Sequence, residues 1–204
     1  PATPSQLYAG TSRGVFKSVN GGLNWQASSQ GLPANITVFS LSIRPNHPNT
    51  LYAGTTEGVF KSVDAGSSWN GTDNLLVGQQ ILVVTVDAVA NIVYAGTPTG
   101  LYASTDDGSS WQSLGADLPT TGVKGISGGN EWRTIYLGTT AGIFKGNRGS
   151  DNWVGLSNGL VSRDILTLAV DPLQTDKLYA GTAGGGVFSL TQAPSLFMPL
   201  VYRN

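Results

Sequence analysis

The carboxylates of this sequence are the side chains whose chemistry is easiest to name. Hydrolysis of a glycosidic bond uses two carboxyl groups about 5–10 Å apart, one on each side of the bond. Glu57 with Asp117 or Asp164 is the one set that loop positions could bring together. No motif links these three residues, so ordinary solvated loop charges are the alternative interpretation.

Other catalytic chemistries lack the residues that they need. The sequence has no cysteine and a single histidine, His47, which lies in the proline-rich segment 44–49. A zinc site needs three or four His, Cys or acidic ligands, and no motif supports a Ser–His nucleophile. We therefore expect no metal and no cofactor, and we favour a non-catalytic role over an enzymatic one.

Cationic and aromatic side chains suggest ligand binding as a second kind of chemistry. Lys17, Lys61 and Lys145 recur at one position of a repeat, where their stems would cover apolar surface while the ammonium groups stay in water. Contact with an anionic partner is the alternative. Trp132 lies outside every repeated motif, so it could contact a sugar or a peptide, or equally fill a gap in the core.

Composition excludes several classes of protein. The 204 residues carry a formal net charge of −1 and have a pI near 5.7, whereas a nucleic-acid surface needs a basic stripe. The longest apolar run, 81–86, is far shorter than the ~20 residues of a membrane-spanning helix. Because the sequence starts at Pro1 rather than Met, we expect a processed or trimmed form. The 28 glycines and 11% charged residues are typical of many short strands joined by tight turns.

Five copies of one β pattern organise the chain. LYAGT or a close variant occupies 7–11, 51–55, 93–97, 135–139 and 178–182, so the copies start 44, 42, 42 and 43 residues apart. A fixed period in this range indicates a repeat architecture. A glycine turn follows each copy and leads into a second short run such as GVFKS at 58–62.

A second motif, Ser-x-Asp/Asn-x-Gly-x-x-Trp, follows at 18–25, 62–69 and 104–111, and we call these segments the box turns. The Asp or Asn can accept backbone hydrogen bonds and close the turn, and the Trp is expected to plug the layer between neighbouring sheets. Asp64 and Asp106 are therefore interpreted as structural. The segment 146–153 has Arg148 in place of the acid, and no box follows Ser189. The structural residues are Ser18, Asn20, Gly22, Trp25, Ser62, Asp64, Gly66, Trp69, Ser104, Asp106, Gly108 and Trp111.

An apolar run precedes most copies and supplies the fourth strand of each unit. These runs are 37–43, 81–86, 165–170 and, in a more polar version, 122–127. Within 37–43, Phe39, Leu41 and Ile43 alternate with Val38, Ser40 and Ser42, which predicts two opposite faces. Four antiparallel strands in about 42 residues are typical of a propeller blade, with the apolar strand innermost.

The predicted fold is all-β: one five-bladed β-propeller domain over 1–204, whose first blade lacks its inner strand. We place 196–202 (LFMPLVY) as the outer strand of the fifth blade. Pairing of 196–202 in the first blade, which would close the ring, is the alternative. The missing strand also leaves open that the chain is the C-terminal part of a longer propeller.

The box turns carry a family resemblance. S-x-D-x-G-x-[ST]-W resembles the Asp-box of the BNR repeat, and its tandem use with LYAGT and GVFKS is similar to the BNR and sortilin-like β-propeller superfamily. The resemblance covers nearly the whole chain and implies an extracytoplasmic or secreted protein. That superfamily includes sialidases, xyloglucan-hydrolysing glycosidases, sortilin ectodomains and photosystem-assembly propellers, so function does not follow from fold. A sialidase would need an arginine cluster with a Tyr–Glu pair, which these loops do not supply.

Function is expected in the loops on the face opposite the box turns. Their charged members are Arg13, Glu57, Asp117, Arg163 and Asp164, with Lys124 on an inner strand. We predict a non-catalytic binding or scaffolding propeller that contacts a protein, peptide or carbohydrate there. A glycoside hydrolase, or a fragment of one, is the alternative. Small residues on the inner strands predict a narrow axis with room for water or a small polar group: Ser40, Ser42, Thr85, Thr167 and Ala169.

Overall fold

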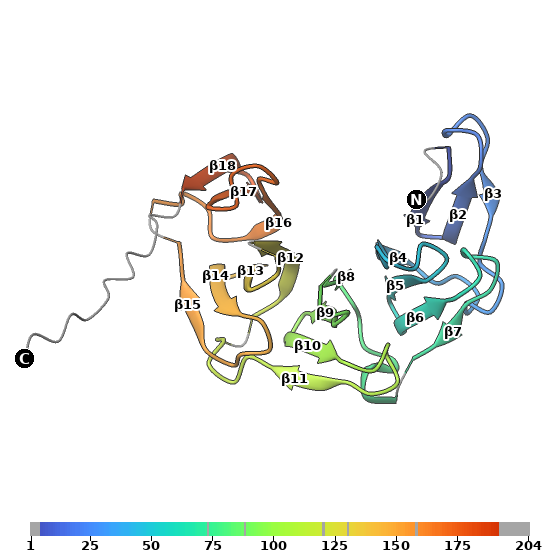
Figure 1. The fold of residues 1–204 in the computed structure, drawn as a ribbon, viewed down its shortest axis with the longest axis horizontal. Helices are drawn as coiled ribbons and strands as arrows, with labels where there is room; N and C mark the ends of the chain where they lie inside the picture. Colours follow the sequence, from blue (N-terminus) through green and yellow to red (C-terminus); the bar gives the residue numbers. More distant parts are fainter. Residues whose placement is uncertain are drawn as a thin grey trace, which may run out of the picture.

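The structure is a computed structural model that describes residues 5–72, 74–87, 89–119, 121–129, 131–157 and 159–191. These residues form five antiparallel sheets (Figure 1). The described part of the chain has no α-helix, and its one helical element is a 3-10 turn, η1 (Asn74–Leu76). The strand predicted at 196–202 lies outside the described residues.

Each sheet is built from consecutive strands, in the order of the sequence repeats. The first comprises β1 (Leu7–Thr11), β2 (Gly14–Ser18) and β3 (Gln26–Ala27); the second comprises β4 (Val38–Ile43), β5 (Leu51–Thr55), β6 (Gly58–Ser62) and β7 (Asn70–Gly71). The third comprises β8 (Val83–Val86), β9 (Val93–Thr97), β10 (Gly100–Ser104) and β11 (Gln112–Leu114). The fourth comprises β12 (Val123–Gly129), β13 (Thr134–Thr139), β14 (Gly142–Asn147) and β15 (Trp153–Gly155); the fifth comprises β16 (Ile165–Val170), β17 (Lys177–Thr182) and β18 (Gly186–Thr191).

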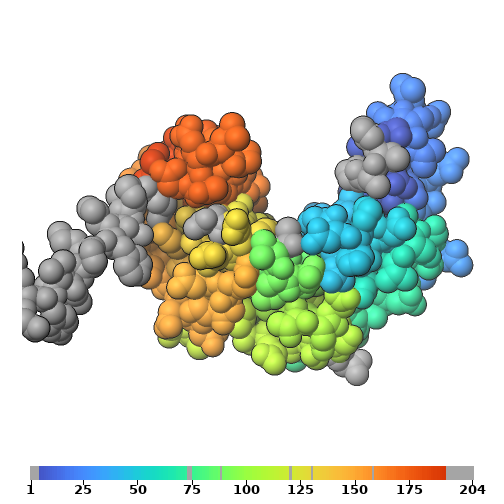
Figure 2. Space-filling model, in the orientation of Figure 1, coloured from blue at the N-terminus to red at the C-terminus, as the bar shows by residue number. Residues whose placement is uncertain are grey.

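The sheets stand side by side as radial blades, with β4, β8, β12 and β16 innermost (Figure 1). The first blade begins with β1, as the missing apolar run predicted. The five blades follow an arc, and Figure 2 shows an opening between the first blade and the fifth. The described residues therefore form an open arc around a concave centre, whereas the sequence predicted a narrow axis.

The hydrophobic core is divided among the layers between neighbouring blades. One such layer joins Tyr52 and Val59 of the second blade to Val84, Val93 and Trp111 of the third. Tyr52 and Tyr94, at the same place in successive LYAGT copies, are completely buried. Because every layer needs the same large side chain at the same place, the tyrosine recurs with the period of the blades.

The glycine of LYAGT is required by close approach of the next inner strand. A Cβ at Gly10 would lie 2.8 Å from Val38 of β4, and one at Gly54 would lie 2.9 Å from Ile81, just before β8. A Cβ at Gly138 would lie 2.7 Å from Ile165 of β16. Real Cβ atoms do not approach so closely, so only glycine lets adjacent blades pack at this spacing.

The predicted alternation of β4 is wrong at its start, because the strand carries a β-bulge. The pairing of β4 with β5 shifts register between Val38 and Ser40. Val38 is consequently buried in the core, whereas Phe39 is 44% exposed. Equivalent shifts occur around Lys124 in β12 and Leu166 in β16. An extra residue at such a point redirects the following side chains, and alternation in the sequence does not reveal it.

Candidate functional site

The order of antiparallel strands assigns every connection to one of two faces. The turns β1–β2 and β5–β6 lie on one face, together with the links from β11 to β12 and from β15 to β16. We call this the loop face. The box turns, between the third and fourth strands of each full blade, lie on the opposite face, the box face. All five predicted site residues lie on the loop face: Arg13, Glu57, Asp117, Arg163 and Asp164.

Two predicted residues of the loop face form an ion pair. Lys124 Nζ of β12 lies 2.7 Å from Asp164 Oδ1, just before β16, and both side chains are partly exposed. The pair joins two neighbouring inner strands. Asp164 is thus matched to a cation rather than to Glu57 or Asp117.

The remaining members of the set are separate, exposed side chains. Arg13, Asp117 and Arg163 are exposed. Glu57 borders a shallow cleft of about 180 Å³ whose other walls include Pro33, Phe60 and Val77. Within the described ranges, no ion pair or hydrogen bond joins the Glu57 carboxylate to another candidate. Glu57, Asp117 and Asp164 lie on loops of different blades, and no contact joins their carboxylates within the described residues.

Two inner strands carry exposed apolar residues that the sequence pattern did not indicate. Phe39 and Leu166, at the bulges of β4 and β16, are 44% and 49% exposed. The small residue Ser40 does not simply line an axis, because its Oγ accepts a hydrogen bond from Val84 N at 3.2 Å and so joins β4 to β8. Thr167 and Ala169 are exposed.

The box-turn carboxylates are bound within their own turns. Asp64 Oδ1 accepts hydrogen bonds from Ser62 Oγ at 2.8 Å and Ser68 N at 2.9 Å, and Oδ2 accepts one from Ser68 Oγ at 2.6 Å. Asp106 is held in the same way by Ser104 and Ser110. The hydrogen bonds from Ser68 lower the pKa of Asp64 to about 2. A carboxyl group with such a pKa stays ionised and is a poor proton donor near neutral pH.

The box-turn tryptophans differ in their surroundings. Trp69 and Trp111 are buried, and their indole Nε1 groups donate to Ser28 O and Thr72 Oγ1 of the preceding blade. Trp25 is 42% exposed and donates to Gly22 O of its own turn. The expectation that every such Trp plugs a layer is wrong for Trp25, because no described blade precedes the first.

The two remaining candidate ligands have structural surroundings. Trp132 stacks on Tyr94, with ring centroids 6.4 Å apart and planes within 2°, so it fills the core rather than presenting a free aromatic surface. His47 is exposed in the turn before β5, where its backbone N donates to Arg44 O. Residues 5–72, 74–87, 89–119, 121–129, 131–157 and 159–191 contain no cluster of three His, Cys, Asp or Glu suited to a metal.

Ion pairs on the box face join consecutive blades with alternating polarity. Between the second and third blades, Arg44 Nη1 contacts both carboxylate oxygens of Asp107, at 2.8 and 2.9 Å. Between the third and fourth, the acid comes first: Asp87, fully buried, lies 2.7 Å from Arg148 Nε. The departure of the fourth box from its motif therefore has a physical reason, since Arg148 neutralises a buried carboxylate.

Comparison with known proteins bears on the fold. No family model and no curated protein matches this chain. Among solved structures it resembles the GH74 xyloglucanase from Xanthomonas campestris, with a TM-score of 0.68 and 21% identity over 93% of this chain and 37% of that one. YCF48 bound to D1 peptide gives a TM-score of 0.68 and 14% identity, over 92% and 60% of the two chains. The extracellular domain of BT4673 from B. thetaiotaomicron gives a TM-score of 0.71 and 17% identity, over 94% and 25%.

These likenesses are to parts of larger molecules. The chain spans less than two thirds of each of the three solved proteins. None of the helical residues in the described part forms a segment long and apolar enough to cross a membrane. The radial sheets and the structural likenesses together identify the fold of this chain as a β-propeller.

Proposed function

We propose that this chain is a non-catalytic binding or scaffolding propeller of the Asp-box, sortilin-like type, whose loop face contacts a peptide or a glycan. The observation that carries the proposal is the Lys124–Asp164 ion pair. In this pair the carboxylate of Asp164, one of the three candidate acids, contacts the ammonium group of Lys124. Glu57 borders a separate, shallow cleft. Binding needs neither a proton donor nor a paired carboxylate.

Further support comes from the character of the loop face and from the structural neighbours. Arg13, Glu57, Asp117 and Arg163 present both signs of charge to solvent, and Phe39 and Leu166 add exposed apolar surface on the inner strands β4 and β16. A mixed surface of this kind suits an extended polar ligand with some apolar groups. YCF48, a propeller of the same general shape, is seen with a peptide, which favours a peptide here. The extracellular domain among the neighbours supports an extracytoplasmic location.

The test is a screen of the purified chain against peptide and glycan libraries, followed by alanine at Arg13, Glu57, Asp117, Arg163 and Asp164 together. The combined variant should lose the selected ligand, and binding to the unmodified chain should weaken with salt because the contacts are exposed charges. Asp176→Ala, a change of an exposed charge on the box face, is the matched control and should leave binding unchanged. Retention of full affinity by the combined variant would refute the loop-face site.

The same preparation tests the hydrolase alternative. Purified protein is incubated with xyloglucan, and new reducing ends are measured for the unmodified chain and for Glu57→Gln. We expect no release of reducing ends by either protein. Turnover that disappears in Glu57→Gln would establish catalysis and overturn the non-catalytic assignment.

A further inference from the structure

Neighbouring blades leave a cleft on the box face, and the described residues line such a cleft at three junctions of the arc. Between the first and second blades it has a volume of about 330 Å³, between the second and third about 230 Å³, and between the third and fourth about 140 Å³. Equivalent positions of the repeat line all three clefts. One such position carries a side-chain amide each time: Gln26, Asn70 and Gln112. We call them the first, second and third interblade clefts.

The clefts differ in charge at two equivalent positions. The second cleft has a cation, Lys61, and an acid, Asp107, whose carboxylate lies 3.5 Å from Lys61 Nζ. In the third cleft these positions are Ala103 and Gly149, so neither charge is present. In the first cleft Lys17 keeps the cation, but the position of the acid is Ala65. In the second cleft the acid is shared between Lys61 and Arg44. Of the three clefts, the first therefore has the largest volume, and the repeat position beside its cation has no acid.

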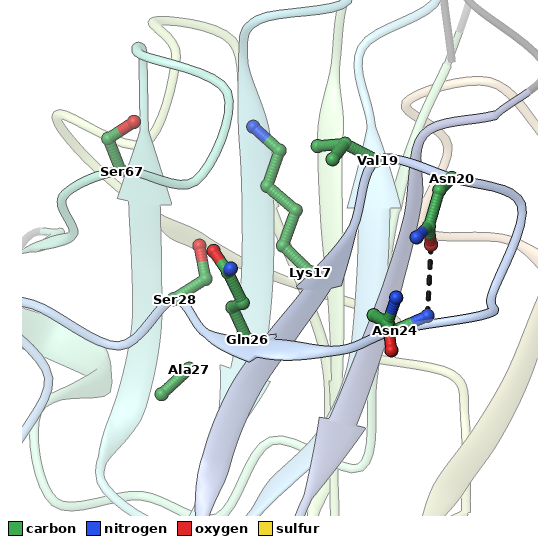
Figure 3. Close-up of a pocket in the computed structure, with 8 residues that line it drawn as sticks. All are labelled: Lys17, Val19, Asn20, Asn24, Gln26, Ala27, Ser28 and Ser67. Carbon is green, nitrogen blue, oxygen red and sulfur yellow. Dashed lines mark hydrogen bonds between the residues drawn. The ribbon is translucent and has the colours of Figure 1, made fainter.

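Lys17 is held in position while most of its hydrogen-bonding capacity remains free. Its Nζ donates to Ala65 O at 2.8 Å and lies 5.5 Å from the centroid of the Tyr8 ring. Among the described residues no carboxylate lies within 4.0 Å of this Nζ. An ammonium group has three donors, so two remain for a ligand. Figure 3 shows the Lys17 side chain extending between Val19 and the Ser28 wall of the cleft.

Neutral polar groups make up much of the remaining lining. They come from both blades, and those used here are Asn20, Asn24, Gln26, Ser28 and Ser67 (Figure 3). Asn20 Oδ1 already accepts hydrogen bonds from Ser18 Oγ and Asn24 N, which leaves the Asn20 Nδ2 as a donor. Ser28 Oγ donates to Gly66 O and can still accept a hydrogen bond. One cation among several neutral donors and acceptors complements a ligand with one carboxylate and several hydroxyl groups.

We propose that the first interblade cleft binds an acidic saccharide, with the carboxylate of a uronic acid on Lys17 and its hydroxyl groups on Asn20, Gln26 and Ser67. The volume lies at the lower end of the range for small-molecule sites, ~300–1,000 Å³, which fits a sugar better than a bulky cofactor. A single lysine also suits one carboxylate better than a dense polyanion. Asp64 is an acid close enough to Tyr8 to contribute to raising its pKa, after the larger effect of burial.

This site is on the face opposite the one that we propose for the main ligand, so the two proposals stand or fall separately. The test is an NMR titration of the isotopically labelled chain with four uronate trimers, built from galacturonate, glucuronate, mannuronate or guluronate. At least one trimer should shift the backbone amides of 17–28 and 65–67. Its methyl ester keeps the sugar rings and removes the charge, and it should bind about tenfold more weakly or worse, the range of one charge-assisted hydrogen bond.

Two variants and one control locate the carboxylate. Ala65→Asp restores the acid of the second cleft, and the backbone tolerates it, because Ala65 (φ 57°) and Asp107 (φ 63°) have the same left-handed conformation. Ala65→Asp and Lys17→Met should each weaken binding about tenfold or more, whereas Lys61→Met in the second cleft should not change it. The spectrum of each variant reports whether it is folded.

Three outcomes would overturn the assignment. They are the failure of all four trimers to bind, equal binding of ester and acid, and unchanged affinity in a folded Lys17→Met variant. A hexaglutamate peptide is included as a competitor. Shifts of the same amides by the peptide at lower concentrations than by any trimer would show an acidic-peptide site and likewise refute the saccharide.

Discussion

The indole Nε1 of Trp69 donates a 2.7 Å hydrogen bond to Ser28 O, so the box turn of the second blade is anchored to the outer edge of the first. Trp25 occupies the same place in its own repeat, and among the described residues its indole donates to Gly22 O of its own turn rather than to another blade. The tryptophan of the box turn therefore stabilises the contact between two blades only where a described blade precedes its own. This difference can be measured.

Trp69→Ala should be far more destabilising than Trp25→Ala. Loss of a buried Trp from a packed layer costs about 3–5 kcal/mol of unfolding free energy, whereas a substitution at the exposed site should cost about 1 kcal/mol or less. Urea denaturation followed by circular dichroism measures both changes. Similar midpoints for the two variants would contradict the interblade role of Trp69.

The two ion pairs at 2.7 Å should differ strongly in strength because they differ in burial. Asp87 is fully buried, so Arg148→Met should cost about 3–5 kcal/mol by leaving an uncompensated charge. The Lys124–Asp164 pair is partly exposed on both sides, and its removal should cost about 1 kcal/mol or less.

Double-mutant cycles on the two pairs provide the measurement. Asp87→Asn preserves the acceptor of the Val89 and Ala90 amides, so it is the suitable partner for Arg148→Met. Lys124→Met with Asp164→Asn is the matched exposed cycle. A coupling energy for the buried pair no larger than that for the exposed pair would show that burial does not set the strength here.

Acid should weaken the box turns over a defined pH range. Hydrogen bonds from Ser68 hold the pKa of Asp64 at about 2, below its ordinary value of 3.8. Since the folded state binds its proton less readily than the unfolded state, the contribution of Asp64 is complete above about pH 5 and is lost as the pH falls towards 2. Carbon-detected NMR of the carboxyl group should give this pKa directly, and Ser68→Ala should raise it.

Asp64→Asn provides the control for the pH experiment, because Asn20 shows that a box turn accepts an amide at this place. In that variant the stability should depend less steeply on pH between about 5 and 2. An unchanged slope would mean that the Asp64 carboxylate does not contribute to acid sensitivity.

Alanine substitutions at Gly31 and Gly21 distinguish the energetic cost of a steric collision from the cost of backbone strain. Both have positive φ angles, 87° and 70°, so alanine at either should cost about 1 kcal/mol for the left-handed conformation. A Cβ at Gly31 would also collide with the carbonyl group of Trp69, whereas at Gly21 nothing lies within 4 Å. Gly31→Ala should therefore cost about 1–3 kcal/mol more than Gly21→Ala. Equal losses in thermal unfolding would show that the first and second blades are not packed as described.

Much of the fold could be predicted from the sequence because each blade repeats the same local rules. The five LYAGT copies and the glycine turns correspond to strands and to the turns between them, and the first sheet of the described residues begins with β1, without an inner strand before it. The wrong predictions concern relations that no single repeat contains. The bulge after Val38 exposes Phe39, and Trp25 is exposed because no described blade precedes the first, which its own motif does not reveal.

The candidate site was harder to predict, because it depends on pairings between repeats. Lys124 and Asp164 are 40 positions apart and meet only because β12 and β16 are adjacent. Nothing in either segment indicates the partner. Likewise, Lys17 and Lys61 occupy the same position of the repeat. Only the structure shows that Lys17 lies beside Ala65, whereas Lys61 lies beside the carboxylate of Asp107. Assignment of the loop-face residues as a binding site remains a prediction.

The alternating ion pairs of the box face also constrain how this repeat array can change. Arg44 precedes Asp107 at one junction, and Asp87 precedes Arg148 at the next. Unequal recombination that deleted the third repeat would bring Arg44 next to Arg148 and remove both acids, so that two cations would meet at the new junction. The polarity of the pairs at these two junctions therefore disfavours the loss of the third repeat.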